Sequence, residues 1–173
     1  MRFSIRQIIR GFAAPDYRLS CRGGLWRSIL RELRRRTENR HESGAFLLGK
    51  IEDNRRRILQ AVYYDDLDPN AYETGICVVK GPAFAKLWQI CRSTNNSVVA
   101  DVHVHPGAAF QSWSDKTNPS LPNQGHIAII VPSLAKPPIR INDLGIFEYT
   151  GQFRWKDLGH THAQRHFYVG LCG

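Results

Sequence analysis

The chain has 173 residues, of which 42% are hydrophobic and 10% aromatic, so it can build the buried core of one ordinary domain, and general disorder is excluded. No apolar run approaches the roughly 20 residues of a membrane helix, and arginines interrupt the first fifteen residues, where a signal peptide would be apolar. No two of the four cysteines have the C-x-x-C spacing of a zinc ribbon or a redox motif. We therefore expect a cytoplasmic protein with reduced thiols and no membrane partner.

The net charge of +9 comes from the first third of the chain. Residues 1–57 hold 14 arginines and one lysine against six acidic residues, whereas residues 58–173 hold nine basic and nine acidic residues. A region of this charge would attract nucleic acid, an anionic lipid surface or an acidic protein, and a solvated basic face is the simplest alternative. Because the chain carries no helix-turn-helix, zinc-finger or RNA-platform motif, the sequence argues against nucleic acid.

The first predicted elements are a basic helix, a short strand and a second helix. The apolar residues of segment 1–15 have the spacing of one helix face with arginines opposite, which is typical of a docking helix; an organelle transit peptide is the alternative. Residues 17–21 are expected to form a strand. A helix should begin at Gly23 and end at the three arginines 34–36, where cations suit the helix dipole. Its buried stripe should be Leu25, Trp26, Ile29, Leu30 and Leu33.

The rest of the chain predicts strands interrupted by one further helix. The remaining strand signals lie at 45–49, 57–64, 98–105, 126–131, 144–149 and 153–156. The polar segment 65–70 is expected as a loop, and a helix should begin at Pro82. The residues expected on one side of that helix are Phe84, Leu87, Trp88 and Cys91.

This order of elements predicts a single-domain α/β fold with a mixed β-sheet packed by helices. Within it we distinguish the basic N-terminal helix (1–15), the main domain (16–158) and a C-terminal tail (159–173). The tail is expected to be irregular or to hold one final short element.

The segment 98–106 carries the strongest chemical signal. Alternate residues of a strand face the same side, so Val102 and Val104 should enter the core while His103 and His105 project together from the other face. Two imidazoles that converge in this way are a pair of metal ligands.

The loop after this strand supplies a carboxylate, Asp115. Two histidines and one aspartate leave the fourth position of a tetrahedral zinc site open, as in catalytic zinc sites, where water is activated near neutral pH. Glu42, beside a glycine at the mouth of a buried strand, is the best candidate for the group that moves the proton. Ser112 is a candidate donor to a developing oxyanion.

Other residues have simpler interpretations. The histidines His160, His162 and His166 form a rival metal cluster, but no acid accompanies them. His126, at the start of an apolar strand, is expected to be packed or hydrogen-bonded rather than a ligand. Trp113 is either part of the core or part of a substrate groove.

With Glu42 before an apolar strand, then His103-x-His105-Pro106 and Ser112-x-x-Asp115, the chain resembles the JAMM/MPN family of zinc metalloproteases over residues 17–156. The resemblance implies a JAMM/MPN (cytidine-deaminase-like) architecture. It also implies that His103, His105 and Asp115 bind zinc, that Glu42 is the acid/base and that Ser112 donates to the oxyanion. Nine residues separate His105 from Asp115, one fewer than is usual in the family, which makes Ser114 an alternative to Ser112.

The amino-acid sequences of segments 42–49 and 111–119 look closest to bacterial members of this family. Those members are encoded with ubiquitin-activating-like and conjugating-like enzymes, as in anti-phage defence operons. The resemblance implies an isopeptidase or peptidase that releases a ubiquitin-like protein from its precursor or conjugates, with the enzymes of the same operon as further partners. The alternative is a non-catalytic MPN-type scaffold that uses its basic N-terminal region to contact protein or nucleic acid.

Overall fold

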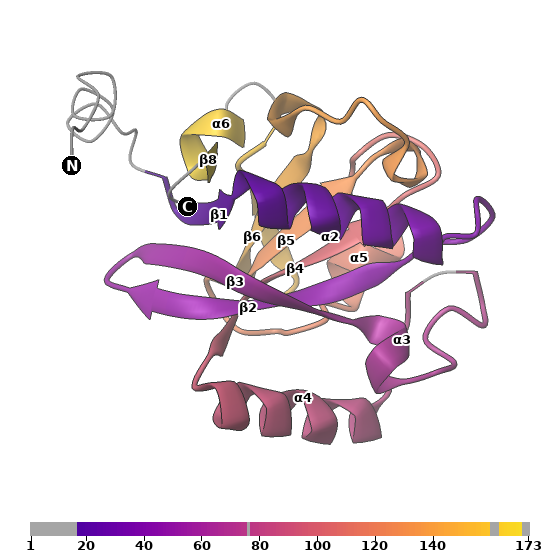
Figure 1. Ribbon diagram of the computed structural model, residues 1–173, viewed down its shortest axis with the longest axis horizontal. Coiled ribbons are helices and arrows are strands. Elements are labelled where there is room, and N and C mark those ends of the chain that lie inside the picture. Colours follow the sequence, from indigo (N-terminus) through magenta and orange to yellow (C-terminus); the bar gives the residue numbers. More distant parts are fainter. Residues whose placement is uncertain (1–16, 76, 160–162, 171–173) are drawn as a thin grey trace.

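The computed structural model describes residues 17–75, 77–159 and 163–170 (Figure 1). The expected helix over 1–15 lies outside these residues, as do His160, His162 and Cys172. The strands are β1 Leu19–Arg22, β2 Gly44–Glu52, β3 Arg55–Tyr63, β4 Ser97–Val104, β5 Ile127–Val131, β6 Gly145–Gly151, β7 Arg154–Asp157 and β8 Phe167–Gly170. The helices are α2 Gly23–Arg36, α3 Tyr64–Leu67, α4 Gly81–Thr94, α5 Trp113–Thr117, α6 Ala163–His166 and the short 3₁₀ turns η1 Ser133–Ala135 and η2 Ile141–Asp143.

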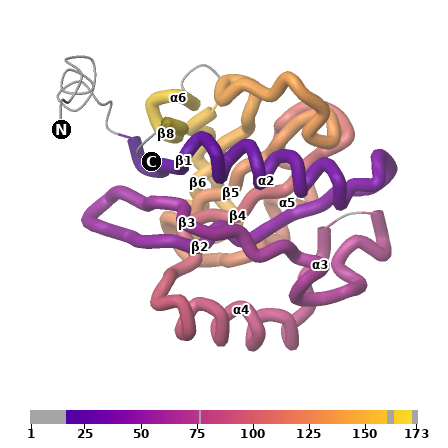
Figure 2. The backbone as a smooth tube through the Cα atoms, in the orientation of Figure 1, coloured from indigo at the N-terminus to yellow at the C-terminus, as the bar shows by residue number. Residues whose placement is uncertain are grey.

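The described strands form one curled eight-stranded sheet in the order β7-β6-β5-β4-β2-β3-β1-β8. The sheet is mixed: β4 pairs in parallel with β5 and β1 with β3 and β8, whereas the other neighbours are antiparallel. The expected α/β fold with a mixed sheet and packed helices is therefore confirmed. Figure 2 shows the two ends of the described chain, β1 and β8, side by side at one edge.

Helices cover both faces of this sheet, with α2 on one face and α4 on the other (Figure 1). Strand alternation divides the core accordingly: Ala45 and Leu47 of β2 pack in the cluster under α2, whereas Phe46 and Leu48 pack in the cluster under α4. β2 is buried on both faces at this point, which explains why its sequence is a continuous apolar run.

Three local expectations need correction or completion. The segment expected as a loop begins with helix α3, because Tyr64 and Leu67, three residues apart, both pack in the core under α4. Trp88, expected on the same side of α4 as Leu87, is 39% exposed, whereas Leu87 is fully buried. Residues 163–170, set apart as a tail, form α6 and add β8 to the edge of the sheet.

None of the helices within the described residues has both the length and the apolar character needed to cross a bilayer.

Candidate metal centre

β4, which lies between β2 and β5, carries the predicted ligand His103 and leads directly to the second, His105. As expected, Val102 and Val104 are fully buried in the cluster under α2. His103 and His105 are also buried, so both faces of β4 are covered. His105 lies just beyond the strand, where its backbone N–H donates to Val131 and its carbonyl accepts from Leu134. These hydrogen bonds keep the backbone of His105 aligned with β4 although the strand has ended.

Asp115 comes from the loop after β4 and lies in the first turn of α5. Its carboxylate Oδ2 accepts the backbone N–H of Ser112 at 2.7 Å, and its backbone N–H donates to Ser112 Oγ at 3.1 Å. This reciprocal capping box fixes where α5 begins. The same loop rests on β6, since a Cβ added at Gly145 would lie 2.2 Å from the carbonyl oxygen of Ala109.

The three predicted ligands converge. Nε2 of His103 lies 3.0 Å from Nε2 of His105. Of the two Asp115 carboxylate oxygens, Oδ1 lies 3.4 Å from Nε2 of His103 and Oδ2 lies 3.4 Å from Nε2 of His105. Ligand atoms in a tetrahedron with zinc-type bonds of about 2.0–2.2 Å are about 3.3–3.6 Å apart. His103, His105 and Asp115 could therefore hold a metal ion. Three protein ligands would leave the fourth position of a tetrahedral site open.

The electrostatics of the centre favour a positive charge. Burial alone would lower the pKa of His103, but the carboxylates of Asp101 and Asp115 outweigh burial and raise that pKa to about 10. Burial alone would raise the pKa of Asp115, but the contacts with His103 and His105 hold it well below its ordinary value. Without a metal, the positive charge that balances these carboxylates is the proton on His103. A bound metal cation can supply that positive charge instead.

The pairing of β2 with β4 brings Glu42 to this centre. Gly44 pairs with His103, so the chain just before β2 passes His105. Oε1 of Glu42 lies 3.7 Å from Nε2 of His105, and Oε2 accepts the backbone N–H of Cys77 at 3.3 Å. The Glu42 side chain is 15% exposed. A carboxylate in this place can exchange a proton with a group bound beside the histidines.

The two candidate serines, Ser112 and Ser114, have different surroundings. Because the Ser112 hydroxyl accepts the Asp115 N–H, its own proton remains available for donation. Ser114 lines a neighbouring cavity of about 530 Å³.

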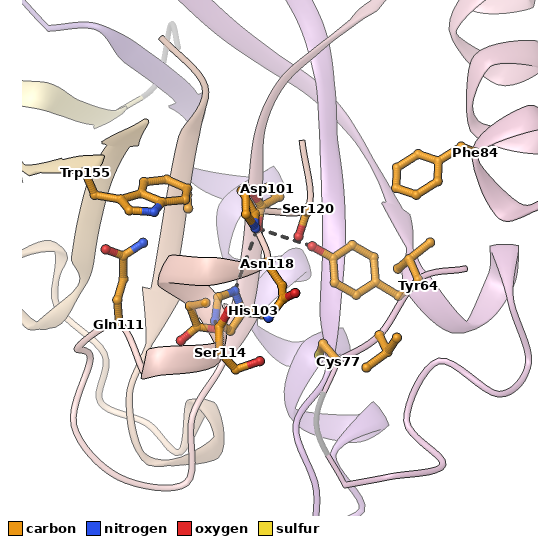
Figure 3. A pocket seen from close by; sticks show the side chains of 15 residues that line it. Tyr64, Cys77, Phe84, Asp101, His103, Gln111, Ser114, Asn118, Ser120 and Trp155 are labelled. Carbon is orange, nitrogen blue, oxygen red and sulfur yellow. Dashed lines mark hydrogen bonds and ion pairs between the residues drawn. The ribbon is translucent and has the colours of Figure 1, made fainter. Parts of the chain in front are cut away.

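This cavity opens beside His103 and Asp115. In Figure 3, Trp155 and Gln111 stand on one side of it and Tyr64 and Phe84 on the other. The cavity therefore offers apolar and neutral polar surface next to the metal ligands. Trp113, by contrast, points out of the core and is 79% exposed.

Sequence reasoning missed a buried carboxylate, Asp101. Its Oδ1 lies 2.5 Å from Nε2 of His126, its Oδ2 accepts the Tyr64 hydroxyl at 3.2 Å, and Oδ2 lies 3.7 Å from Nδ1 of His103. Figure 3 shows Tyr64 and His103 directed at this residue. A signal existed, because Asp101 precedes His103 by two positions and so shares its face of the strand. As expected, His126 is buried and hydrogen-bonded.

No known family model matches this sequence. Among solved structures, protein DSY2949 from Desulfitobacterium hafniense is similar with a TM-score of 0.60 at 16% identity, over 82% of this chain and 90% of that chain. A protein from Salinibacter ruber is similar with a TM-score of 0.49 at 18% identity, over 75% of this chain and 84% of that chain. The likeness to the Desulfitobacterium protein extends to the fold alone.

Proposed function

We propose that this chain is a zinc-dependent peptidase or isopeptidase of the JAMM/MPN type, which cleaves a ubiquitin-like protein from its precursor or conjugates. The observation that carries the proposal is the position of Glu42 beside His105, at the edge of three convergent ligands. A site for structural zinc would use all four positions for protein side chains, whereas this one offers three and a neighbouring acid.

The donor set suits zinc, since two imidazoles and one carboxylate are common in catalytic zinc sites. When bound, zinc would supply a Lewis acid that polarises a carbonyl and activates water near pH 7. Glu42 takes up the proton of the attacking water and returns it to the leaving amine. Ser112 donates its free hydroxyl proton to the oxygen on which negative charge develops, with Ser114 as the alternative donor.

The cavity and the chain beside it suit an extended substrate. Residues 77–80 have no regular secondary structure, and Cys77, Val78 and Val79 line the cavity next to the metal ligands. An extended C-terminal tail of a ubiquitin-like protein can lie along such a segment by backbone hydrogen bonds, as in strand addition. The proposal places the protein in the cytoplasm of a bacterium, in an anti-phage ubiquitin-like pathway with activating-like and conjugating-like enzymes as further partners.

The test compares the parent chain with Glu42→Gln on a fusion of the ubiquitin-like protein to a reporter. We expect the parent to hold a zinc ion per chain and to cleave the fusion, and Glu42→Gln to keep zinc but cleave at least about 100-fold more slowly, since proton transfer contributes about 10²–10⁴-fold. Glu38→Gln, on the exposed turn before the site, is the matched control and should cleave like the parent.

Two outcomes would contradict this proposal. Cleavage by Glu42→Gln at the parent rate would remove the assigned acid/base. A parent chain that holds zinc but cleaves neither fusions nor conjugates would instead favour the non-catalytic scaffold.

A further inference from the structure

Asp101 is a buried carboxylate that the proposed chemistry does not use. It lies in the middle of β4 and is 2% exposed. An ionised carboxylate in such a place is costly unless its oxygens accept hydrogen bonds from several donors. The groups that contact Asp101 should therefore show which interactions stabilise its negative charge.

Two donors hold this carboxylate in place independently of the metal ligands. The Tyr64 hydroxyl donates to Oδ2 at 3.2 Å, and the ring of His126 meets Oδ1 at 2.5 Å. Burial, together with the charge of Asp101, raises the pKa of Tyr64 well above its ordinary value, so this hydroxyl keeps its proton. Tyr64 comes from α3 and His126 from the turn before β5, so two elements clamp a residue of a third.

The clamped oxygen faces the ring nitrogen of His103 that the metal centre does not use. Oδ2 lies 3.7 Å from Nδ1 of His103, whereas Nε2 of the same ring lies 3.4 Å from Asp115 and 3.0 Å from His105. An ionised carboxylate can only accept, so it favours the tautomer in which Nδ1 carries the proton. In that tautomer the lone pair of Nε2 is directed at the metal centre.

We propose that Asp101 is a positioning residue, which holds the His103 ring with Nδ1 protonated and Nε2 free to bind a divalent cation. Tyr64 and His126 act through Asp101 by fixing its carboxylate. This inference rests on the metal centre of the proposed function but not on peptide cleavage. It assigns the buried network a role in cation affinity beyond that of packing.

The test measures zinc affinity by competition with a chromophoric chelator, alongside the free energy of unfolding of each chain. We expect Asp101→Asn to bind zinc about 10- to 100-fold more weakly than the parent, the usual loss when the partner of a metal-bound histidine is changed. Asp65→Asn is the matched control, because Asp65 also accepts a tyrosine hydroxyl, from Tyr72 at 3.1 Å, but does not face His103. It should lose stability without losing zinc affinity.

A second measurement covers the case in which Asp101→Asn does not fold. In the zinc-loaded parent, nitrogen-15 NMR of the imidazoles should show His103 protonated at Nδ1. A proton on Nε2, or Asp101→Asn that folds less stably but binds zinc like the parent, would overturn the positioning role and leave the metal centre standing. A parent chain that binds no zinc would overturn both the metal centre and this inference.

Discussion

Asp115 and Ser112 close a capping box at the start of α5, and the same Asp115 carboxylate lies 3.4 Å from the imidazoles of His103 and His105. One carboxylate therefore stabilises a local turn and completes a long-range cluster. Because the cap fixes the start of the helix, it also fixes the direction from which the carboxylate meets the histidines.

The two roles of Asp115 can be separated by Asp115→Asn. The amide oxygen can still accept the Ser112 N–H, but the negative charge is lost, so we expect a loss of zinc binding of at least about tenfold with a drop in unfolding free energy of about 1 kcal/mol or less. Asp143→Asn is the matched control, since Asp143 accepts the backbone N–H of Arg140 at 2.7 Å in a similar cap outside the site. Equal zinc content in Asp115→Asn and the parent, measured by mass spectrometry of the metal, would contradict the ligand assignment.

Ser112→Ala should affect both stability and rate. Removal of an N-cap hydroxyl costs about 1 kcal/mol of unfolding free energy, and removal of an oxyanion donor slows cleavage about 10²–10³-fold. Ser114→Ala, whose hydroxyl lies at the cavity rather than in the cap, should change neither by much. The comparison needs denaturant unfolding and steady-state kinetics; if Ser114→Ala is the slow variant, the assignment of the oxyanion donor is reversed.

Gly145→Ala should disturb the loop that leads to Asp115. A Cβ at this position would lie 2.2 Å from the backbone carbonyl oxygen of Ala109 and 2.8 Å from the ring of Phe147, so backbone would have to move to make room for it. We expect a loss of at least about 1–3 kcal/mol in unfolding free energy, as for other overpacked sites, together with weaker zinc binding. Gly24→Ala is the control, because a Cβ there meets nothing within 4 Å. Parent-like stability and zinc affinity in Gly145→Ala would show that this loop position does not govern the site.

The ion-pair cluster at the end of α2 predicts a loss of stability in acid. The hydrogen bond from Arg35 and the contacts with Arg36 lower the pKa of Glu32 from its ordinary value of 4.5 to about 2, despite opposing desolvation. Because the pKa is depressed in the folded state, this stabilisation is fully present above about pH 4.5 and is lost as the pH falls through about 2.

At pH 7, Glu32→Gln should therefore lower the free energy of unfolding by up to about 1 kcal/mol, as expected for a partly exposed ion pair. The difference from the parent should shrink between about pH 4.5 and 2. Chemical denaturation across this range tests it, with Glu38→Gln, whose partner Arg40 is largely exposed, as the control that should show no change. A difference that persists unchanged at pH 2 would refute the electrostatic explanation.

Much of the architecture could be predicted from local sequence. The alternation around His103 and His105 predicted that the two imidazoles project from the same side, and the apolar run at 45–49 predicted a buried strand, which is part of β2. These predictions succeed because the direction of a side chain depends on its own stretch of backbone, whose period is two in a strand. The resemblance to the JAMM/MPN family remains a prediction.

Tertiary structure decided what those side chains meet. Glu42 lies beside His105 because β2 pairs with β4 in one register, and a shift by one residue would turn every side chain of β2 to the other face. Asp101 meets Tyr64 and His126 because α3 and the turn before β5 converge on one strand. Local periodicity contains no information about which distant segments pair, so the neighbours of each ligand emerge only when the chain packs into a single core.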